Sequence, residues 1–457
     1  MLLQSINPAT NQTIKAYESH SPQEVQQKIE QTQQAWKNWR LTDMEQRKEL
    51  LTRLAAVLRK HRESLAVLMA NEMGKPIKQG LAEVEKSAHC CAYYAANAAA
   101  QLQDMLIPTE AARSYASFQP LGIVLAVMPW NFPFWQVFRF LAPALAAGNA
   151  ALLKHASNVP GCALAIEALV KEAGFPPQLF QTLLIGSKEV EKVLEHPYVK
   201  AATLTGSTPA GKQVAQKAGS LLKKVVLELG GSDPYIILKD ADLELAAEAC
   251  VTSRLINSGQ SCIAAKRFIV EASVQEAFTR LFVEKMQARK MGDPLNPATD
   301  IGPQARTDLR DELHSQVTTS IEKGAVCLLG GILPPGNHAY YPPTVLTHVQ
   351  PGMPAYEEEL FGPVAAIITA KDEADAIRIA NDTIFGLGAA VFTNDSAKGE
   401  HIARTQLDAG ACFVNSFVQS DPRLPFGGIK ESGFGRELGL FGIREFVNIK
   451  TISVRNY

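Results

Sequence analysis

The sequence predicts an α/β protein with two doubly wound α/β domains and a small additional β element. Apolar, strand-like segments alternate with amphipathic, helix-like segments from about residue 121 to residue 415. Residues 121–128 are continuously apolar, as is typical of a strand buried on both faces of a parallel sheet. Gly230-Gly231 divides the alternating region into two blocks. Such alternation predicts a mostly parallel sheet covered by helices in each block.

The first hundred residues are predicted to be helical. Ser21-Pro22-Gln23-Glu24 has the pattern of a capping box with proline at the first helical position, and it opens an amphipathic run to about residue 40. Further helices are expected over residues 43–62, up to Gly74, and over 83–102. Gly74 suits the left-handed conformation that closes a helix, with Pro76 just beyond it.

The two blocks follow in order. In the first, strands are predicted at residues 121–128, 150–154, 180–184, 199–204 and 224–229, with helices from 134 and at 159–173, 188–194 and 208–218. In the second, helices at 243–257, 274–290, 374–381 and 396–407 alternate with strands at 267–271, near 326, 345 and 364, and at 389–393 and 411–415. Residues 115–119 and 446–454 have the pattern of exposed strands, and an unpaired terminal strand tends to join a sheet edge, such as that of a neighbouring subunit.

Composition excludes several classes of protein. The chain has 457 residues, 46% of them hydrophobic and 20% charged, which is typical of a globular protein with a large core. Its 45 basic and 46 acidic residues create no overall field that would attract nucleic acid or an anionic membrane. The apolar segments are too short to span a bilayer, and the N-terminus lacks the features of a signal peptide. A soluble cytoplasmic protein is therefore expected.

The seven cysteines argue against disulfides and metal sites. Their number is odd and no Cys-x-x-Cys pair occurs, so neither a disulfide framework nor a zinc site is expected. The nine histidines form no metal-ligand pattern either. Most of the cysteines are expected to be buried packing residues.

Several loop motifs follow predicted strands, and each has an ordinary structural explanation when it is taken alone. The segment Gly206-Ser207-Thr208-Pro209-Ala210-Gly211-Lys212 resembles a P-loop, but Gln213 replaces the hydroxyl residue that would hold Mg²⁺. It could bind a phosphate at a helix N-terminus or be a plain strand–helix turn. Cys262 could be a packing residue, Glu228 a solvated carboxylate at a strand end, and Asn131 a helix cap.

Together, these motifs resemble the NAD(P)-dependent aldehyde dehydrogenase superfamily over essentially the whole chain. Trp130-Asn131-Phe132-Pro133, a lysine at a strand end, Thr205-Gly206-Ser207-Thr208, Glu228-Leu229-Gly230-Gly231, Gly259-Gln260-Ser261-Cys262, Glu359-x-Phe361-Gly362-Pro363 and Pro425-Phe426-Gly427-Gly428 occur in the order of that family. The interval between Glu228 and Cys262 also has the length that the family shows. Residues 227–234 and 154–156 are particularly similar to bacterial succinate-semialdehyde dehydrogenases of the shorter type.

The resemblance implies a domain organisation. Residues 1–105 and 121–229 would form a Rossmann-like NAD(P)-binding domain, and residues 230–425 the catalytic domain. Residues 106–120 and 440–457 would form a β element for oligomerisation. A homodimer or homotetramer is expected.

The resemblance also implies a covalent mechanism. Cys262 would attack the aldehyde, and the oxyanion of the adduct would accept hydrogen bonds from the Asn131 side chain and the Cys262 backbone. Hydride transfer to the nicotinamide would leave a thioester, and Glu228 would be the general base for its hydrolysis.

The family's cofactor contacts carry over to matching positions. Lys154 would bind the adenosine ribose, and Gly206 and Ser207 would approach the pyrophosphate. Trp130, Glu359 and Phe361 complete the set of expected cofactor-binding residues. Ser157 stands where many strictly NAD-dependent members have Glu, so the repulsion of a 2′-phosphate is absent. NAD is the expected cofactor, with NADP tolerated.

The substrate is expected to be succinate semialdehyde. Arg139 matches the position at which relatives that act on this aldehyde carry an arginine, and it would pair with the distal carboxylate, although a structural role is the alternative. Ile256 stands where those relatives often have a second arginine. Arg254 points away on the predicted helix, so Ser420 is the expected additional ligand.

Two other functions remain open at this point. One is a medium-chain or aromatic aldehyde dehydrogenase in which Phe132, Trp135 and Phe417 form an apolar funnel. The other is a cofactor-independent thiol esterase that uses Cys262 and Glu228.

Overall fold

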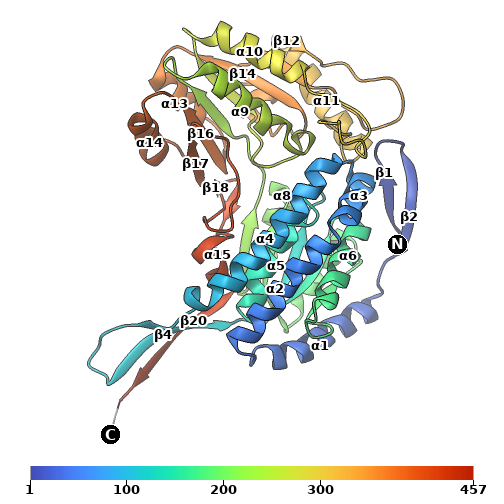
Figure 1. Cartoon of the computed structure of the whole chain (residues 1–457), viewed down its shortest axis with the longest axis vertical. Helices are drawn as coiled ribbons and strands as arrows, with labels where there is room; N and C mark the ends of the chain where they lie inside the picture. The colour runs from blue at the N-terminus through green and yellow to red at the C-terminus, as the bar shows by residue number, and fades with distance from the viewer. Residues whose placement is uncertain (1, 456–457) are drawn as a thin grey trace.

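The computed structural model describes residues 2–455, and two large β-sheets organise it (Figure 1). The first sheet has the order β19-β9-β8-β5-β6-β7, and its strands from β5 to β9 run parallel. Its members are β5 (Ile123–Met128), β6 (Ala150–His155), β7 (Phe180–Thr182), β8 (Val199–Thr205), β9 (Lys224–Glu228) and β19 (Gly433–Phe434). The chain proceeds from β5 to β7 in one direction and then returns to β8 and β9 on the other side of β5. The sheet is therefore doubly wound, as predicted.

The second sheet has the order β12-β13-β14-β11-β10-β16-β17 and is parallel except for β12. Its strands are β10 (Pro234–Ile237), β11 (Arg267–Glu271), β12 (Val326–Leu329), β13 (Thr344–Thr347), β14 (Val364–Ala370), β16 (Gly388–Phe392) and β17 (Ala411–Val414). Two short strands, β15 (Phe385–Gly386) and β18 (Ile429–Lys430), pair separately. The predicted α/β class with two parallel sheets is confirmed.

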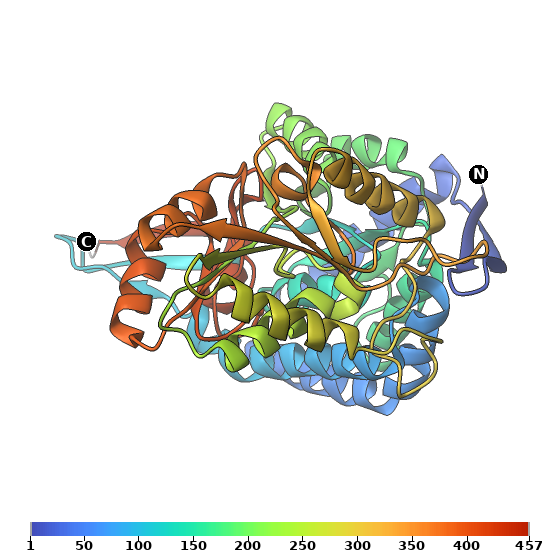
Figure 2. The same ribbon diagram turned by 90° about the horizontal axis from the view of Figure 1, so that it is seen from above.

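Helices cover both sheets (Figures 1 and 2). Those around the first sheet are α1 (Pro22–Trp39), α2 (Met44–Lys60), α3 (Arg62–Met73), α4 (Ile77–Gln101), α5 (Trp135–Ala146), α6 (Pro160–Glu172), α7 (Val190–Glu195) and α8 (Thr208–Ser220). Those that follow are α9 (Leu243–Leu255), α10 (Gln275–Gln287), α11 (Thr307–Glu322), α12 (Pro354–Glu357), α13 (Glu373–Asn381), α14 (Ser396–Thr405) and α15 (Gly439–Glu445). The capping box at Ser21 and the left-handed Gly74 are both present, as the sequence predicted.

A third, three-stranded sheet projects from the body as an arm (Figures 1 and 2). It pairs β20 (Val447–Val454) with β4 (Arg113–Pro120), and β4 with β3 (Met105–Leu106). The strand pattern predicted for the C-terminal tail is therefore correct. The division of the chain into domains and the oligomerising role of this arm stay predictions.

Several elements differ from the sequence-based expectation. The chain begins with a hairpin of β1 (Leu2–Asn7) and β2 (Gln12–Glu18), which was not expected because its residues are mostly exposed and give little apolar alternation. Helix α11 was missed because only three of its residues are buried. Strand β10 was missed because it is short and starts at a proline. In addition, α4 begins at Ile77 rather than at residue 83.

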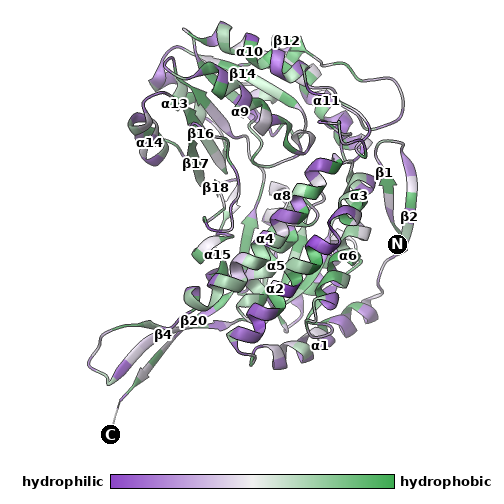
Figure 3. Ribbon diagram, viewed as in Figure 1, coloured by the Kyte–Doolittle hydropathy of each residue, from purple (hydrophilic) through white to green (hydrophobic). Residues whose placement is uncertain are grey.

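Hydrophobic residues concentrate in the sheet strands and on the inner faces of the helices (Figure 3). Between residues 2 and 455, no helix has the length and apolar character required to cross a bilayer. The same part of the chain contains no group of three or more His, Cys, Asp or Glu side chains suited to holding a metal ion.

Candidate active site

The candidate site lies at the carboxyl ends of the parallel strands, where the chain changes its winding direction. A cavity there is bordered by Trp130 and Asn131, which follow β5, and by Gly206 and Ser207, which follow β8. The carboxyl ends of β5 and β8 form the switch point of the first sheet, which is where ligands bind in open α/β sheets. Cys262 lines the same cavity, so the structure brings the predicted nucleophile to the predicted cofactor crevice.

Cys262 is held by a strained loop that follows α9. Asn257, Ser258 and Gly259 are consecutive residues in the left-handed region, with φ values of 53°, 56° and 79°. Such conformations are costly for non-glycine residues and concentrate at functional sites. Gly259 also packs so closely on Gly362 that a Cβ atom would lie 2.2 Å from the Gly362 carbonyl carbon. The loop is therefore fixed, and it places Cys262 on the wall of two cavities at once.

Asn131 lies beside this loop. Its Nδ2 atom donates to the backbone oxygen of Gln260 at 3.1 Å, and the Asn257 side chain donates to the Asn131 backbone oxygen at 2.7 Å. Glu83 fixes the helix that follows, because one of its oxygens accepts from the Phe134 and Trp135 backbone N–H groups at 2.9 and 3.0 Å. The amide of Asn131 is thus placed next to the segment that carries Cys262.

The surroundings of Cys262 favour the neutral thiol over the thiolate. Burial raises its pKa to about 12, although the cationic Arg139 and Lys266 act in the opposite direction. Lys266 is close because its ammonium group donates to the Cys262 backbone oxygen at 2.6 Å. The thiol therefore needs a base, or its thiolate needs further stabilisation, before Cys262 can attack an aldehyde.

Glu228 lies at the end of β9, and its side chain is almost fully buried. Within residues 2–455, neither of its carboxylate oxygens has a hydrogen-bond partner. Burial raises the pKa of Glu228 well above its usual value, and the nearby Glu437 raises it further, while Arg139 opposes both. Gly427 is required here, because a Cβ atom at that position would lie 2.7 Å from Oε1 of Glu228.

The remaining walls of the first cavity suit a cofactor. Trp130 and Phe361 pack edge to face with ring centroids 5.7 Å apart. One oxygen of Glu359 accepts from Lys266 at 3.1 Å and from the Gly231 backbone at 3.2 Å. Ser207 caps α8 without a side-chain hydrogen bond, which leaves the N–H groups of the first helical turn for an anion.

A second cavity begins where β6 ends. Lys154, Ser157 and Asn158 line it together with Gly186 and Ser187. Ser157 is exposed, and burial lowers the pKa of Lys154. The Nδ2 atom of Asn158 is buried without a partner from residues 2–455, so the cavity contains a donor in need of an acceptor. These groups fit a hydroxylated or phosphorylated ribose.

A third cavity of about 180 Å³ lies on the other side of Cys262. Phe132, Trp135 and Phe417 line it, so the three rings of the predicted funnel do converge. Arg139 and Ser420 line it as well.

The side chain of Arg139 is already engaged within the protein. Its guanidinium group forms an ion pair with Glu437, donates to Thr205 Oγ1 at 3.2 Å and lies over the ring of Phe426. A direct contact with a substrate carboxylate stays a prediction. Arg254 is turned inward and donates to the Gly259 backbone oxygen at 2.6 Å. It therefore does not replace the arginine that some relatives have at the position of Ile256.

Sequence reasoning missed two lysines of the site. Lys266 links Glu359 to the Cys262 loop, and Lys86 extends from α4 into the third cavity. Lys86 lies three positions after Glu83 and four before Cys90, which are both buried, so a charged residue on the inner face of a helix was the available signal.

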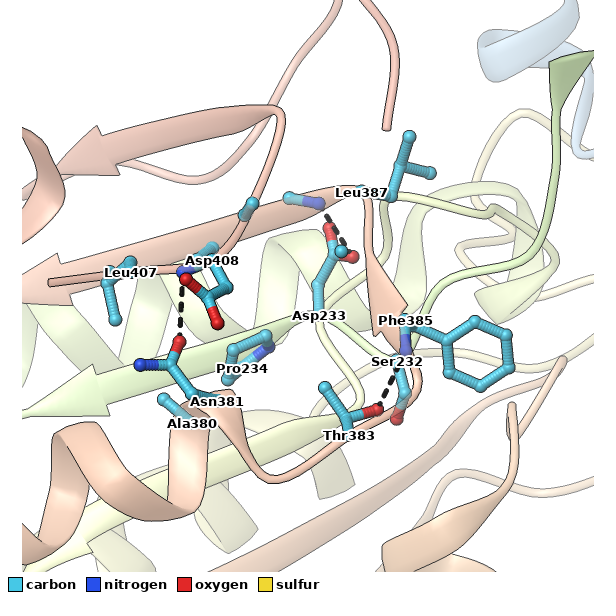
Figure 4. A pocket seen from close by; sticks show the side chains of 14 residues that line it. Ser232, Asp233, Pro234, Ala380, Asn381, Thr383, Phe385, Leu387, Leu407 and Asp408 are labelled. Atoms are coloured by element: carbon cyan, nitrogen blue, oxygen red, sulfur yellow. Dashed lines mark hydrogen bonds between the residues drawn. The ribbon is translucent and has the colours of Figure 1, made fainter. Parts of the chain in front are cut away.

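A further small pocket surrounds Asp233 behind the site (Figure 4). Its volume is about 10 Å³, which is no more than a single water requires. Burial raises the pKa of Asp233 to about 7, and one of its oxygens accepts from the Gly388 backbone at 3.1 Å. The hydrogen bond between Asp233 and Gly388 joins the starts of β10 and β16. The pocket beside it has no room for a substrate.

Comparisons with known proteins identify the family of this chain. The sequence model of the "Aldehyde dehydrogenase family" matches residues 2–452. The chain is 51% identical to a "Probable succinate-semialdehyde dehydrogenase [NADP(+)]" of Synechocystis, with 99% of both chains covered. It is 46% identical to a succinate semialdehyde dehydrogenase [NAD(P)+] of Escherichia coli, with 98% of this chain and 97% of the other covered.

Solved structures give the same result. The NADP+ complex of succinic semialdehyde dehydrogenase from Streptococcus pyogenes superposes with a TM-score of 0.97 at 36% identity. That match covers 99% of this chain and all of the other. The agreement of sequence, fold and site shows that the chain belongs to the aldehyde dehydrogenase family.

Proposed function

We propose that this chain oxidises succinate semialdehyde to succinate. The observation that supports this substrate is the third cavity, where apolar rings extend from Cys262 toward cationic and hydroxyl side chains. Among the described residues, the one carboxylate that lines this cavity belongs to Glu83, which is neutralised by its ion pair with the buried Lys75. Such a cavity fits an aldehyde whose other end is anionic. The names of the Synechocystis, Escherichia coli and Streptococcus pyogenes relatives support the same substrate.

The cavity also supports a second candidate, a medium-chain or aromatic aldehyde, because Phe132, Trp135 and Phe417 line it. Its volume of about 180 Å³ favours the shorter substrate, since pockets for drug-sized ligands usually have about 300–1,000 Å³.

In the proposed mechanism, Cys262 gives up its thiol proton to solvent, and the resulting thiolate Sγ bonds to the aldehyde carbon as the C=O π bond becomes the oxyanion of a hemithioacetal. The Asn131 side chain and the Cys262 backbone N–H donate hydrogen bonds to the oxyanion, and each such donor typically contributes about 2.7–4 kcal/mol. A nicotinamide cofactor held in the first cavity would supply the hydride acceptor. Glu228 then takes a proton from the water that attacks the thioester, which releases the acid and restores the Cys262 thiol.

For the cofactor, we propose that NADP is accepted as well as NAD. Trp130, Gly206, Ser207, Glu359 and Phe361 would hold its nicotinamide, ribose and pyrophosphate parts. Lys154 and Ser157 would hold the adenosine ribose, and the second cavity offers donors where a carboxylate would repel a 2′-phosphate.

Initial rates with succinate semialdehyde, glutarate semialdehyde, butanal and benzaldehyde, each with NAD and NADP, test the proposal. We expect the highest kcat/KM for succinate semialdehyde. A preference for butanal or benzaldehyde would contradict the proposed substrate. Cleavage of an ester in the absence of cofactor would favour the thiol esterase.

We also propose that the arm of β3, β4 and β20 joins copies of the chain into a homodimer or homotetramer. Leu106 and Ile449 on the arm are 68% and 63% exposed, which is unusual for large apolar side chains. Light scattering on the purified chain tests this, and a monomeric mass would contradict it.

A further inference from the structure

Three side chains from distant parts of the chain form a cluster at the wall of the third cavity. Lys86 comes from α4, Trp135 from α5, and Ser420 from the loop between β17 and β18. The Lys86 ammonium group donates to Ser420 Oγ at 2.8 Å, and Trp135 Nε1 donates to the same oxygen at 3.2 Å. The Lys86 ammonium also lies 4.3 Å from the centre of the Trp135 ring.

The hydrogen-bonding capacity of this cluster is unbalanced. A serine oxygen has two acceptor sites and one proton, and both acceptor sites of Ser420 are already used. Its hydroxyl proton is therefore left to donate. The Lys86 ammonium has three protons and uses one on Ser420, so the cluster presents several donors without an acceptor of its own.

Lys86 also lacks a counter-ion in direct contact. Within the part of the chain that the structure describes, its ammonium group forms no ion pair, and the nearby carboxylate of Glu83 is held by Lys75. The carboxylate of Asp421 is held in the same way by Arg423. Arg139, the other cation of the cavity, is neutralised by Glu437. The Lys86 side chain is half-buried, and charges withdrawn from water are normally paired, so an unpaired ammonium on a cavity wall indicates an anionic ligand.

We propose that Lys86 and Ser420 together bind the carboxylate of the substrate. The ammonium forms the ion pair, and the Ser420 hydroxyl donates a second hydrogen bond to the same carboxylate. Arg139 acts behind them by keeping Glu437 neutralised. This assignment rests on the proposed function, and it adds a specificity-determining residue that the sequence motifs did not indicate.

The first test compares Lys86→Met with wild type on succinate semialdehyde and on butanal, which has no carboxylate. A charge-assisted hydrogen bond contributes about 1.5–3 kcal/mol, so kcat/KM for succinate semialdehyde should fall about ten- to 150-fold, mainly through KM. Butanal oxidation should change by less than about threefold, since the catalytic groups are untouched. Ser420→Ala should show a smaller loss in the same direction.

Lys78→Met is the matched control. Lys78 belongs to the same helix but is exposed and pairs with Asp300 at 2.5 Å, so its loss should leave both substrates unaffected. Equal losses for both aldehydes in Lys86→Met would show that Lys86 is structural. No loss for either would also overturn the proposal and would leave the carboxylate to Arg139.

The second test follows pH. Burial lowers the pKa of Lys86 to about 8, with a further lowering from Arg139 on α5. The other groups that face it are Glu83 and Cys90 on α4 and Asp421 in the loop. The pKa of Cys90 is raised far above this range and that of Asp421 is lowered to about 2, so neither changes charge near pH 8.

Lys86 is therefore charged below about pH 8 and neutral above it in the free enzyme. The ratio of kcat/KM for succinate semialdehyde to that for butanal should fall as the pH rises through about 8, because contributions of Cys262 and Glu228 cancel in the ratio. In Lys86→Arg the ratio should stay high and flat, since arginine does not lose its proton. A ratio that is independent of pH in wild type would contradict the proposal.

A third measurement separates this proposal from the proposed function. Succinate should inhibit butanal oxidation competitively, and Lys86→Met should weaken that inhibition at least tenfold. If wild type preferred butanal while this difference persisted, the substrate would be wrong and the carboxylate site correct. Equal inhibition of both enzymes would overturn the site.

Discussion

Ser157→Glu is expected to lower the activity with NADP while leaving the activity with NAD unchanged. Ser157 is exposed at the mouth of the cavity that also contains Lys154 and Asn158. A glutamate there would place a carboxylate beside the 2′-phosphate of NADP, whereas the 2′-hydroxyl of NAD would donate a hydrogen bond to it.

The size of the effect follows from the charges. Two unit charges about 5 Å apart interact by about 3 kcal/mol at an effective dielectric constant of about 20. The phosphate carries more than one charge, but position 157 is exposed, so screening by solvent reduces the repulsion. A net penalty of about 2–3 kcal/mol remains, which corresponds to a loss of roughly 30- to 150-fold in kcat/KM for NADP.

Steady-state rates with saturating aldehyde and varied NADP or NAD measure this directly. Ser157→Gln is the control, because glutamine has the length of glutamate without its charge. Its kcat/KM for NADP should fall by less than about fivefold. Two results would show that the second cavity does not bind the 2′-phosphate. One is an equal loss of kcat/KM for NADP in Ser157→Glu and Ser157→Gln, and the other is an equal loss for NAD and NADP in Ser157→Glu.

Three further variants test the site and its support. Cys262→Ala should lower aldehyde oxidation more than about a thousandfold with cofactor binding unchanged in titrations, and turnover within tenfold of wild type would exclude Cys262 as the nucleophile. Glu228→Gln should slow steady-state turnover but keep a burst of reduced cofactor on rapid mixing; a slow first turnover would place its role before hydride transfer. Glu83→Gln leaves the buried Lys75 without its counter-charge and should lower the free energy of unfolding by about 3–5 kcal/mol in denaturant titrations, whereas Glu85→Gln, at the exposed pair with Arg59, should cost less than about 1 kcal/mol.

The sheets were predictable from the sequence for a local reason. Strands such as β5 are buried on both faces, and that burial requires an uninterrupted apolar run that is visible in the sequence. Asn131 lies just after the carboxyl end of β5 and Glu228 is the last residue of β9, and such ends meet at one edge of a parallel sheet. Cys262 follows helix α9 instead, and only the resemblance to the aldehyde dehydrogenase family indicated it as the nucleophile.

The substrate side of the site could not be predicted in the same way. Lys86 and Ser420 come from opposite parts of the chain, and neither belongs to a motif that signals their contact. The pairing of Arg139 with Glu437 is equally non-local, so no local pattern indicated that the expected carboxylate ligand would be occupied inside the protein. Polar contacts between distant segments depend on how the sheets and helices pack, and local patterns do not encode them.

The same ion pair bears on how Glu228 can act as a base. Arg139 acts electrostatically on two buried carboxyl groups, those of Glu437 and Glu228, and it supplies one positive charge for both. Burial raises the pKa of each carboxyl group, and Glu437 holds the guanidinium directly, so ionising Glu228 as well would place a second negative charge in the same buried region. Both effects favour the neutral form of Glu228. A neutral carboxyl group cannot accept a proton from water, so Glu228 has to lose its own proton before it can act as the proposed general base.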